Sequence, residues 1–264
     1  HYTIEGYMEH CPEGEEERWR AKVEAVGEAE LAEWASTTCG EHQRYELGRF
    51  TRRSTDRGHT WEPPVRLSGT TPHGPNLLSD GRLVFVGSGP LLGRDRRQGD
   101  LVVSLSSNQA RSWEDAGTID GFPPYPGDAP DGIAYLCEPH VLETSPGHML
   151  MMARYEETPR ARERCRLWKA FSEDDGATWT APEETSILGK PPHLTLLADG
   201  RVLVTYGYRH EPYGQRACLS TDGGKTWDVG HEVVLRDDAP SGDLGYPASV
   251  QLEDGSIITV YYQQ

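Results

Sequence analysis

The chain has 264 residues and a formal net charge of -16 at pH 7. This length is enough for one domain with a sizeable core. The negative charge argues against nucleic acid and anionic membranes as partners, and no apolar run is long enough to insert into a membrane. The charge also repels anionic sugars at long range, so an anionic substrate would need a local cluster of arginines.

Five cysteines are too irregularly spaced for a zinc site: Cys11, Cys39, Cys137, Cys165 and Cys218. No metal and no cofactor is expected. A Cys11–Cys39 disulfide and a set of mostly free, buried thiols are the two readings, and free thiols are favoured. The sequence starts at His1 without a charged and then apolar leader, so the export route is not readable. A secreted or periplasmic location is slightly favoured over a cytoplasmic one.

The first forty residues differ in composition from the rest. Glu15–Ser36 is rich in Glu and Ala, and its apolar residues recur at helical spacing. We expect a helical insertion over residues 12–40, packed on the rest of the domain. It would be either a solvated insertion or a lid or oligomer contact, and the solvated insertion is favoured.

One short motif then repeats along the chain. STDRGHTW covers Ser54–Trp61, SEDDGATW covers Ser172–Trp179 and STDGGKTW covers Ser220–Trp227. SSNQARSW, over Ser106–Trp113, is a decayed copy. The pattern suits a tight β-turn, in which the Asp accepts backbone N–H groups, the Gly takes a positive φ and the Trp packs between sheets. The spacing of roughly 50 residues lies in the range of propeller blades.

A second repeat is an apolar strand, an Asp-Gly or Pro-Gly turn and another strand, as in His193–Tyr208. Combined with the first motif, it predicts four-stranded antiparallel sheets. We expect complete sheets over residues 70–120, 133–188 and 191–238, the outer strands of another sheet at 45–68, and the inner strands of a last one at 245–262.

These repeats resemble the Asp boxes of the sialidase-like β-propellers over about residues 45–264. The resemblance implies an all-β fold, a propeller of about five to six blades that forms a single domain over residues 1–264. The last blade is either completed by the first residues or left incomplete. The Asp boxes carry structure and no chemistry, so the fold follows from them more directly than the function does.

Alternation of antiparallel strands puts all the Asp boxes and Asp-Gly turns on one rim, which for Asp56, Asp174 and Asp222 is a direct prediction. The candidate site lies at the other end of the sheets, where inner strands begin or end with polar residues. These residues are His73, Asn76, Glu138, His140, His193, Asp243 and Tyr246 at strand starts, and Arg154, Tyr155, Tyr208, Arg209, His210, Tyr261 and Tyr262 at strand ends.

Two stretches resemble sialidase catalytic motifs. CEPHVLETSPGHMLMMAR implies Glu138 as the group that activates the nucleophile and Arg154 as one arginine that holds a substrate carboxylate. GYPASVQLEDGSIITVYY implies Tyr246 as the nucleophile. A second arginine is implied before the last Asp box, where Arg209 is preferred to Arg216. We therefore expect Tyr246 to contact Glu138, and Arg154 and Arg209 to point into one cavity.

Several residues depart from the sialidase pattern. The first arginine motif is absent, and no residue can be chosen as general acid among Glu41, Glu46, Asp95 and Asp100. Asp243 is the alternative carboxylate at the catalytic end. His73, His140 and His193 are not part of the sialidase set. Each is assigned either to substrate binding, together with Tyr208, or to a structural bond at a blade edge.

The expected activity is that of a retaining exo-glycosidase that removes terminal acidic, sialic-acid-like sugars from a glycan. One alternative is a propeller hydrolase or lyase that acts on rhamnose or uronic-acid glycans. Another is a non-catalytic propeller that binds glycans. The oligomeric state cannot be read from the sequence.

Overall fold

The computed structural model describes residues 49–264 except 90–99, 122, 125, 128–131 and 159–165. The chain divides into two compact units, His1–Gly48 and Arg49–Gln264, and all described residues belong to the second. The expected helical insertion at 12–40 therefore lies outside the described residues, as do Cys11, Cys39 and Cys165. Cys137 and Cys218 are free and buried. The single-domain assignment of the whole chain stays a prediction.

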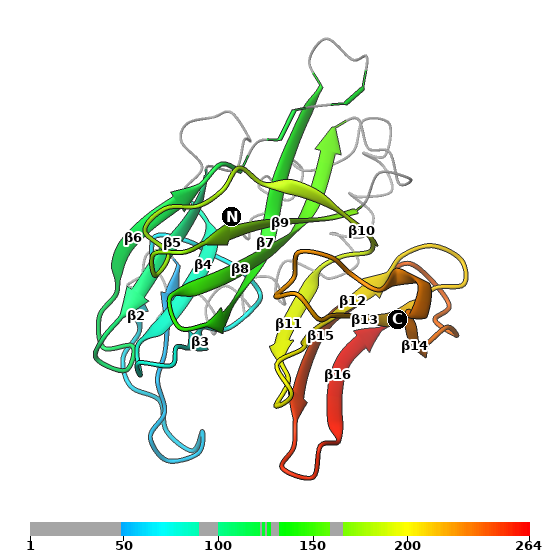
Figure 1. Cartoon of the computed structure of the whole chain (residues 1–264). Coiled ribbons are helices and arrows are strands. Elements are labelled where there is room, and N and C mark those ends of the chain that lie inside the picture. Colours follow the sequence, from blue (N-terminus) through cyan, green and yellow to red (C-terminus); the bar gives the residue numbers. More distant parts are fainter. Residues whose placement is uncertain (1–48, 90–99, 122, 125, 128–131, 159–165) are drawn as a thin grey trace, which may run out of the picture. The chain divides into compact units, whose positions relative to one another are not determined.

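The second unit is built from antiparallel sheets, as predicted (Figure 1). Three sheets have four strands each, formed in chain order: β3–β6 (Asn76–Leu77, Leu83–Ser88, Leu101–Ser106, Glu114–Ile119), β7–β10 (Ile133–Ser145, His148–Thr158, Arg166–Ser172, Glu183–Leu188) and β11–β14 (Pro192–Leu196, Val202–Tyr208, Gly214–Ser220, Val233–Arg236). Two more have two strands each: β1 with β2 (Phe50–Thr51, Val65–Arg66) and β15 with β16 (Leu244–Gln251, Ile257–Gln263). One 3₁₀ turn occurs among the described residues, η4 (Val229–His231), and it precedes β14.

Neighbouring sheets pack face to face through their inner strands. β7 contacts β4 on one side and β11 on the other, and β11 also contacts β15. Strand β8 supplies apolar side chains to both interfaces, because successive residues of a strand face opposite ways. Met149 and Met151 belong to the core shared with β3–β6, whereas Leu150 and Met152 belong to the core shared with β11–β14.

The intact Asp boxes form the turn that their sequence predicts. In the third, Asp222 accepts the backbone N–H of Thr226 at 2.9 Å and its hydroxyl at 2.6 Å, and the Ser220 hydroxyl accepts Gly224 N–H at 2.8 Å. The boxes at Asp56 and Asp174 contain the same bonds. This network lowers the pKa of all three Asp residues.

The decayed box, SSNQARSW, forms the same turn with Asn and Ala in place of the Asp and Gly of the other boxes. Asn108 takes the place of the Asp and accepts Ser112 N–H at 2.9 Å, while Ala110 N–H donates to Ser106 at 2.9 Å. Ala110 adopts a φ of 64°, in the position that Gly occupies in the other boxes. The turn therefore survives at the cost of a strained alanine.

The boxes and hairpin turns meet at one end of the sheets, as the alternation argument predicts. Asp175 N–H donates to Gly147 O in the β7–β8 turn, and Asp175 also pairs with Arg82 beside the β3–β4 turn at 2.9 Å. Arg53, beside the first box, donates to Gln109 of the decayed box. The β1–β2 and β15–β16 connections also point to a common side in Figure 1.

The two-stranded β15–β16 sheet leaves apolar side chains exposed. Val250, Ile258 and Val260 are 53%, 49% and 63% exposed, whereas Leu194 and Val204 of the adjacent four-stranded sheet are buried. The number of blades and the closure of a ring stay predictions. None of the helices among the described residues has the length and apolarity of a membrane span.

Candidate functional site

A third repeat marks the inner strands, and motif reading of the sequence missed it. Pro-His precedes β3 at Pro72-His73, lies within β7 at Pro139-His140 and begins β11 at Pro192-His193, and β15 contains Pro247-Ala248 in its place. The residues directly before these prolines are Thr71, Glu138, Pro191 and Tyr246. Glu138 and Tyr246, the predicted base and nucleophile, therefore hold equivalent positions two sheets apart.

Both residues sit at an irregularity of their strand. The β7–β8 register shifts between Cys137 and His140, and the β15–β16 register shifts between Gly245 and Ala248. Glu138 has a φ of 49° and Tyr246 a φ of 51°. A positive φ is unfavourable for a side chain of this size, and a bulge re-aims the residue that it contains. Such strain concentrates at functional sites.

The two side chains meet, as predicted. The Tyr246 hydroxyl donates to Glu138 Oε1 at 2.7 Å, and Arg154 Nη1 donates to Glu138 Oε2 at 2.8 Å. Arg154 Nη1 also lies 3.3 Å from the Tyr246 oxygen. The predicted contact is confirmed, while the catalytic roles of the three residues stay predictions. A phenol whose proton already points at a carboxylate has an acceptor ready for that proton.

The surroundings hold Tyr246 in its protonated form. Burial and the hydrogen bond to Glu138 raise the pKa of Tyr246 to about 12, while the charges of Arg154 and Arg209 act in the opposite direction. Tyr246 also stacks on Tyr262, with ring centroids 5.8 Å apart. The phenol is thus neutral at rest and loses its proton only in concert with another event, such as bond formation.

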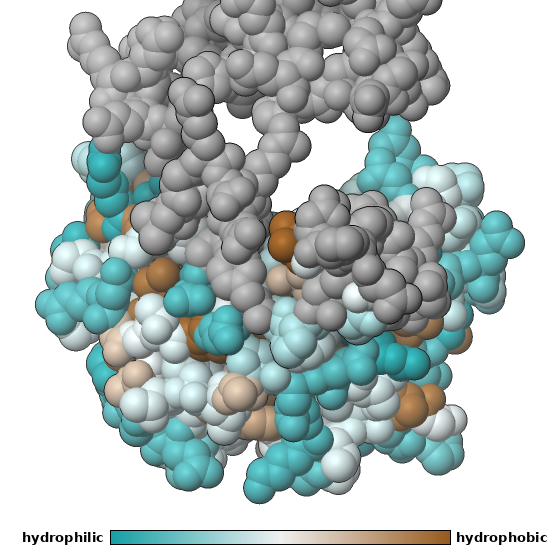
Figure 2. All heavy atoms as spheres, turned by 90° about the horizontal axis from the view of Figure 1, so that it is seen from above, coloured by the Kyte–Doolittle hydropathy of each residue, from teal (hydrophilic) through white to brown (hydrophobic). Residues whose placement is uncertain are grey.

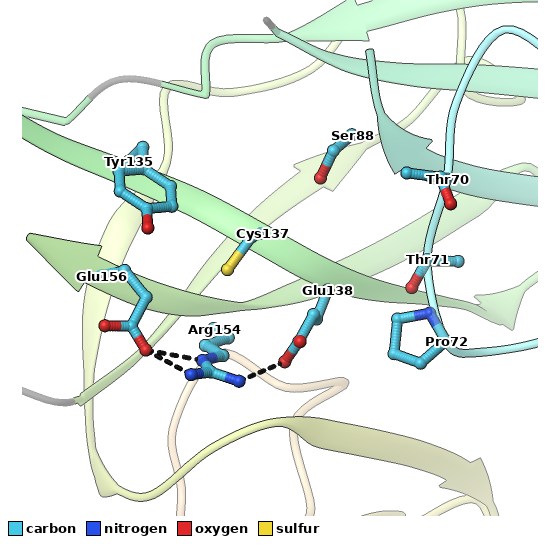
Figure 3. Close-up of a pocket in the computed structure, with 9 residues that line it drawn as sticks. All are labelled: Thr70, Thr71, Pro72, Ser88, Tyr135, Cys137, Glu138, Arg154 and Glu156. Carbon is cyan, nitrogen blue, oxygen red and sulfur yellow. Dashed lines mark hydrogen bonds and ion pairs between the residues drawn. The ribbon is translucent and has the colours of Figure 1, made fainter. Parts of the chain in front are cut away.

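Arg154 is engaged from both sides by carboxylates (Figure 3). Its Nε and Nη2 donate to Glu156 Oε1 at 2.8 and 2.5 Å, and Lys190 Nζ donates to the same oxygen at 2.9 Å. Glu156 is only 4% exposed. Burial opposes ionisation of Glu156, but the hydrogen bond from Lys190 and the charge of Arg154 hold its pKa below the usual value. Glu156 and Lys190 therefore fix the arginine that contacts Glu138.

A cavity of about 500 Å³ adjoins this network. We call it the Glu138 cavity. It is lined by Thr70, Thr71, Pro72, Ser88, Tyr135, Cys137, Glu138, Arg154 and Glu156. In Figure 3, the Thr70–Pro72 segment faces Glu138 across the opening. The Thr71 hydroxyl donates to the Pro139 carbonyl at 2.8 Å, which ties this segment to the bulge that carries Glu138.

Arg209 lines a different cavity, so the prediction that it shares one with Arg154 is wrong. This Arg209 cavity, also of about 500 Å³, is lined by Gly189, Lys190, Arg209, His210, Glu211, Tyr213, Pro240, Ser241, Gly242 and Asp243. Asp243 is exposed to solvent at the edge of this cavity and accepts a hydrogen bond from the Tyr262 hydroxyl. Asp243 is not part of the Tyr246–Glu138–Arg154 contact.

Arg216 and Tyr208 pair with each other away from both cavities. The Arg216 guanidinium lies over the Tyr208 ring, 3.6 Å from its centroid, and forms an ion pair with Glu232. Glu232 also accepts the hydroxyl of buried Tyr206. These bonds place Arg216 and Tyr208 in the packing between sheets. The structure favours Arg209 over Arg216 as the residue near Tyr246.

The three histidines form one cluster, in which His140 is buried and His73 and His193 are partly buried. The rings of His140 and His193 stack with centroids 4.3 Å apart, and His73 lies 5.0 Å from His140. His140 Nδ1 accepts the N–H of Leu194 at 2.8 Å, and His193 Nδ1 accepts the N–H of Ser249 at 3.3 Å. Each therefore links its inner strand to the next one. These bonds favour the structural assignment of the histidines over substrate binding.

The cluster is held uncharged. Burial, and then the nearby His193, lower the pKa of His73 to about 3, and burial lowers the pKa of His193 to about 4. Burial also lowers the pKa of His140 well below its usual value. The described residues contain no group of His, Cys, Asp or Glu that could hold a metal ion.

The general acid is not identified among the described candidates. Asp100 accepts the N–H of Gly121 at 3.4 Å and does not line the Glu138 cavity. Glu41, Glu46 and Asp95 lie outside the described residues. Glu156 and Lys190 escaped sequence reasoning, although each had a signal. Glu156 follows Arg154 by two residues on the same strand face, and Lys190 precedes Pro191, which stands directly before Pro192-His193 of the third repeat.

The sequence matches the family model of the BNR repeat-like domain over residues 28–259. The chain belongs to this family of sialidase-like propellers. Among curated proteins there is no match to the sequence. Among solved structures, a protein of unknown function from Dyadobacter fermentans is 27% identical with a TM-score of 0.67, over 83% of this chain and 60% of that one.

Two further similar structures are glycosidases of the same propeller type. The NanB sialidase from Streptococcus pneumoniae is 16% identical, with a TM-score of 0.55, over 81% of this chain and 32% of that one. The α-L-arabinanase from Penicillium chrysogenum, complexed with arabinobiose, is 18% identical, with a TM-score of 0.57, over 81% and 68%. At these identities the likeness shows the fold alone. This BNR-repeat chain also spans less than two thirds of the Dyadobacter and NanB proteins.

Proposed function

We propose that this chain carries the active site of a retaining glycoside hydrolase for glycans with a terminal acidic sugar. Tyr246 is the nucleophile, and Glu138 accepts its proton. The observation that carries the proposal is the 2.7 Å hydrogen bond from the Tyr246 hydroxyl to Glu138, made by two strained residues at equivalent positions. The fold shared with a sialidase and an arabinanase supports a glycan as substrate.

The reaction has two steps. The Tyr246 oxygen attacks the anomeric carbon as its proton passes to Glu138, and the glycosidic C–O bond breaks while the leaving oxygen takes a proton from a general acid. Water then displaces the sugar from Tyr246 while its proton passes to the conjugate base of the general acid, and Glu138 returns a proton to the phenolate. Arg154 orients Glu138, and the Glu156–Lys190 pair keeps Arg154 in place.

A neutral nucleophile fits an acidic sugar. A carboxylate that attacks an anomeric carbon bearing its own carboxylate would be repelled, whereas a phenol is not. At 4 Å that repulsion is worth about 4 kcal/mol at the effective dielectric of a protein surface. A neutral pentose glycoside is the second candidate, because Arg154 is already bonded to Glu138 and Glu156 and the arabinanase shares the fold.

The test is a panel of fluorogenic sialosides, glucuronides, rhamnosides and arabinofuranosides, assayed with the wild type and with Tyr246→Phe. The variant keeps the ring and loses the nucleophilic oxygen. We expect it to lose turnover by at least a thousandfold while ligand binding is retained. Tyr262→Phe is the matched control, since it removes a hydroxyl from the stacked neighbour and should retain most activity.

A fluorinated sugar that forms a slowly hydrolysed adduct extends the test. Mass spectrometry of the digested protein should then locate the added sugar on the peptide that contains Tyr246. Near-normal turnover of Tyr246→Phe, or an adduct on another residue, would rule out the proposed mechanism. Turnover of arabinofuranosides alone would establish the second candidate.

A further inference from the structure

Arg209 differs from the other partly buried arginines of the described residues because it has no hydrogen-bond or ion-pair partner. Its Nε is fully covered and makes no hydrogen bond. By contrast, Arg154 is bound to Glu138 and Glu156, Arg216 to Glu232, and Arg49 to two backbone carbonyls. A guanidinium that loses part of its hydration without a partner is costly. That cost is recovered if a ligand supplies the partner.

Two glycines bring Arg209 next to the proposed nucleophile. A Cβ on Gly207 would lie 2.9 Å from the Cα of Gly245, so β12 and β15 touch through their backbones at this point. A Cβ on Gly245 would lie 3.6 Å from Arg209 Nη2. The guanidinium therefore lies beside Gly245, the residue that precedes Tyr246.

The charges of the Arg209 cavity are arranged by depth. Lys190 is buried, and Arg209 is partly buried, whereas Glu211 and Asp243 are exposed to solvent. Lys190 is neutralised by Glu156 and Asp243 accepts the Tyr262 hydroxyl, so Arg209 keeps the uncompensated charge of the interior. The carboxylates of Glu211 and Asp243 at the edge of the cavity are solvated, so they offset the charge of Arg209 only weakly.

Both cavities have a lining residue close to Tyr246. Glu138 of the Glu138 cavity accepts its hydroxyl, and Arg209 of the Arg209 cavity lies beside Gly245, which precedes it. A glycosidase that cleaves between two sugar units needs a site for each unit on either side of its nucleophile. At about 500 Å³ each cavity is large enough for a sugar unit.

We propose that the Arg209 cavity binds a carboxylate or sulfate group on the sugar unit adjacent to the one that Tyr246 attacks. Arg209 is the recognition residue, through a paired N–H contact with the anion. The assignment to an adjacent unit rests on the proposed function, whereas the anion site itself does not. The preferred substrate is then an acidic oligosaccharide rather than a single acidic sugar on a neutral carrier.

Calorimetry with two matched disaccharides tests the anion site. The probes are cellobiouronic acid and its neutral counterpart cellobiose, titrated into the Tyr246→Phe protein so that no turnover interferes. We expect the acidic disaccharide to bind more tightly. Adding Arg209→Met should weaken its binding by about tenfold to a hundredfold, and inorganic sulfate should compete with it. Arg201→Met, which removes the same charge at an exposed turn, is the control and should change nothing.

Equal affinity for the two disaccharides, or an unchanged affinity after Arg209→Met, would overturn the anion site. The outcome is independent of catalysis: retained turnover in Tyr246→Phe refutes the proposed reaction and leaves the binding result standing. An active enzyme whose Arg209→Met variant binds the acidic disaccharide normally refutes only the anion site. If Arg209→Met reduces kcat/KM for a singly charged aryl glycoside as much as for an acidic disaccharide, the anion belongs to the attacked unit and the adjacent-unit assignment is wrong.

Discussion

Acid should unfold this domain through its histidine cluster well before most carboxylates are protonated. His73, His140 and His193 are neutral in the fold because burial lowers their pKa values, to about 3 for His73 and about 4 for His193. In the unfolded chain they titrate near pH 6.5. As the pH falls below 6.5, the histidines are protonated in the unfolded chain but stay neutral in the folded one. The free energy of unfolding therefore decreases from about pH 6.5 down to the folded pKa values.

The magnitude depends mainly on the unfolded pKa. At pH 5, each histidine with a folded pKa of 4 or less costs about 1.5 units times 1.36 kcal/mol, or about 2 kcal/mol. His73 and His193 together therefore remove about 4 kcal/mol, a large part of the 5–15 kcal/mol that a domain usually has, and His140 adds to the loss because burial lowers its pKa in the same direction. The hydrogen bonds from Leu194 and Ser249 also oppose protonation of His140 and His193, because a protonated Nδ1 would face the backbone N–H that it now accepts.

Urea denaturation at pH 7.5, 6.5, 5.5 and 5.0 measures this loss. The informative variant is His140→Asn with His193→Asn, since the Asn oxygen sits near the position of Nδ1 and accepts the same N–H without titrating. We expect the wild type to lose at least about 4 kcal/mol of unfolding free energy between pH 7.5 and 5.0 and the double variant, which keeps only His73 of the cluster, about 2 kcal/mol.

The exposed His231, whose side chain is 87% exposed, gives the control, and His231→Asn should follow the wild type at every pH. A wild-type loss below about 1 kcal/mol would refute the argument. So would a double variant that has the same dependence on pH as the wild type, because that dependence would then come from other groups.

Two further predictions concern stability. Glu156→Gln leaves Arg154 and Lys190 without their buried counter-charge and should cost about 3 kcal/mol of unfolding free energy in urea, and a loss below about 1 kcal/mol would mean that the cluster is well solvated. Asp222→Ala removes the acceptor of the Thr226 N–H and hydroxyl and should cost about 2 kcal/mol by the same measurement. Asp254→Ala, in the exposed β15–β16 turn, should cost less than half as much, and equal losses would argue that the Asp box has no special role.

The sheets were predictable from the sequence because their signals are local. An Asp box fixes its own turn through bonds between residues two to four apart, and even Asn108 and Ala110 reproduce it. The contact of Tyr246 with Glu138 needed the resemblance as well. Composition and spacing place both residues at the same end of their sheets, but only the known pattern says that a phenol and a carboxylate at these positions should meet.

The arginines show where sequence reasoning failed. Arg154 lies within β8, whereas Arg209 follows Tyr208, the last residue of β12. Tyr208 contacts Arg216 on the side of β12 that faces the β7–β10 sheet, and the next residue lies beside Gly245 of β15 on the other side. Arg154 lies on the same side of β8 as Met152 and faces the β11–β14 sheet, whereas Arg209 faces β15. Each arginine thus faces the sheet that follows its own, so the two side chains meet different neighbours and line different cavities.

The histidines were ambiguous for a related reason. A polar ring at the start of an inner strand can bind a ligand or accept a backbone N–H from the next strand, and both choices give the same sequence. His140 and His193 accept the N–H groups of Leu194 and Ser249, which lie 54 and 56 residues away from them along the chain. No local pattern encodes such a pairing.

The third repeat joins the fold to the proposed chemistry. Within Glu138-Pro139-His140, the histidine ties its strand to the next one, while the residue before the proline is bulged and directed toward a cavity. Tyr246-Pro247-Ala248 keeps the bulge but has Ala in place of His, and its strand is instead held by His193 of the preceding unit through Ser249. The strain at Glu138 and Tyr246 is thus supported by bonds between neighbouring strands. Because these bonds need neutral histidines, the low-pH limit of any activity at Tyr246 should follow the loss of the fold.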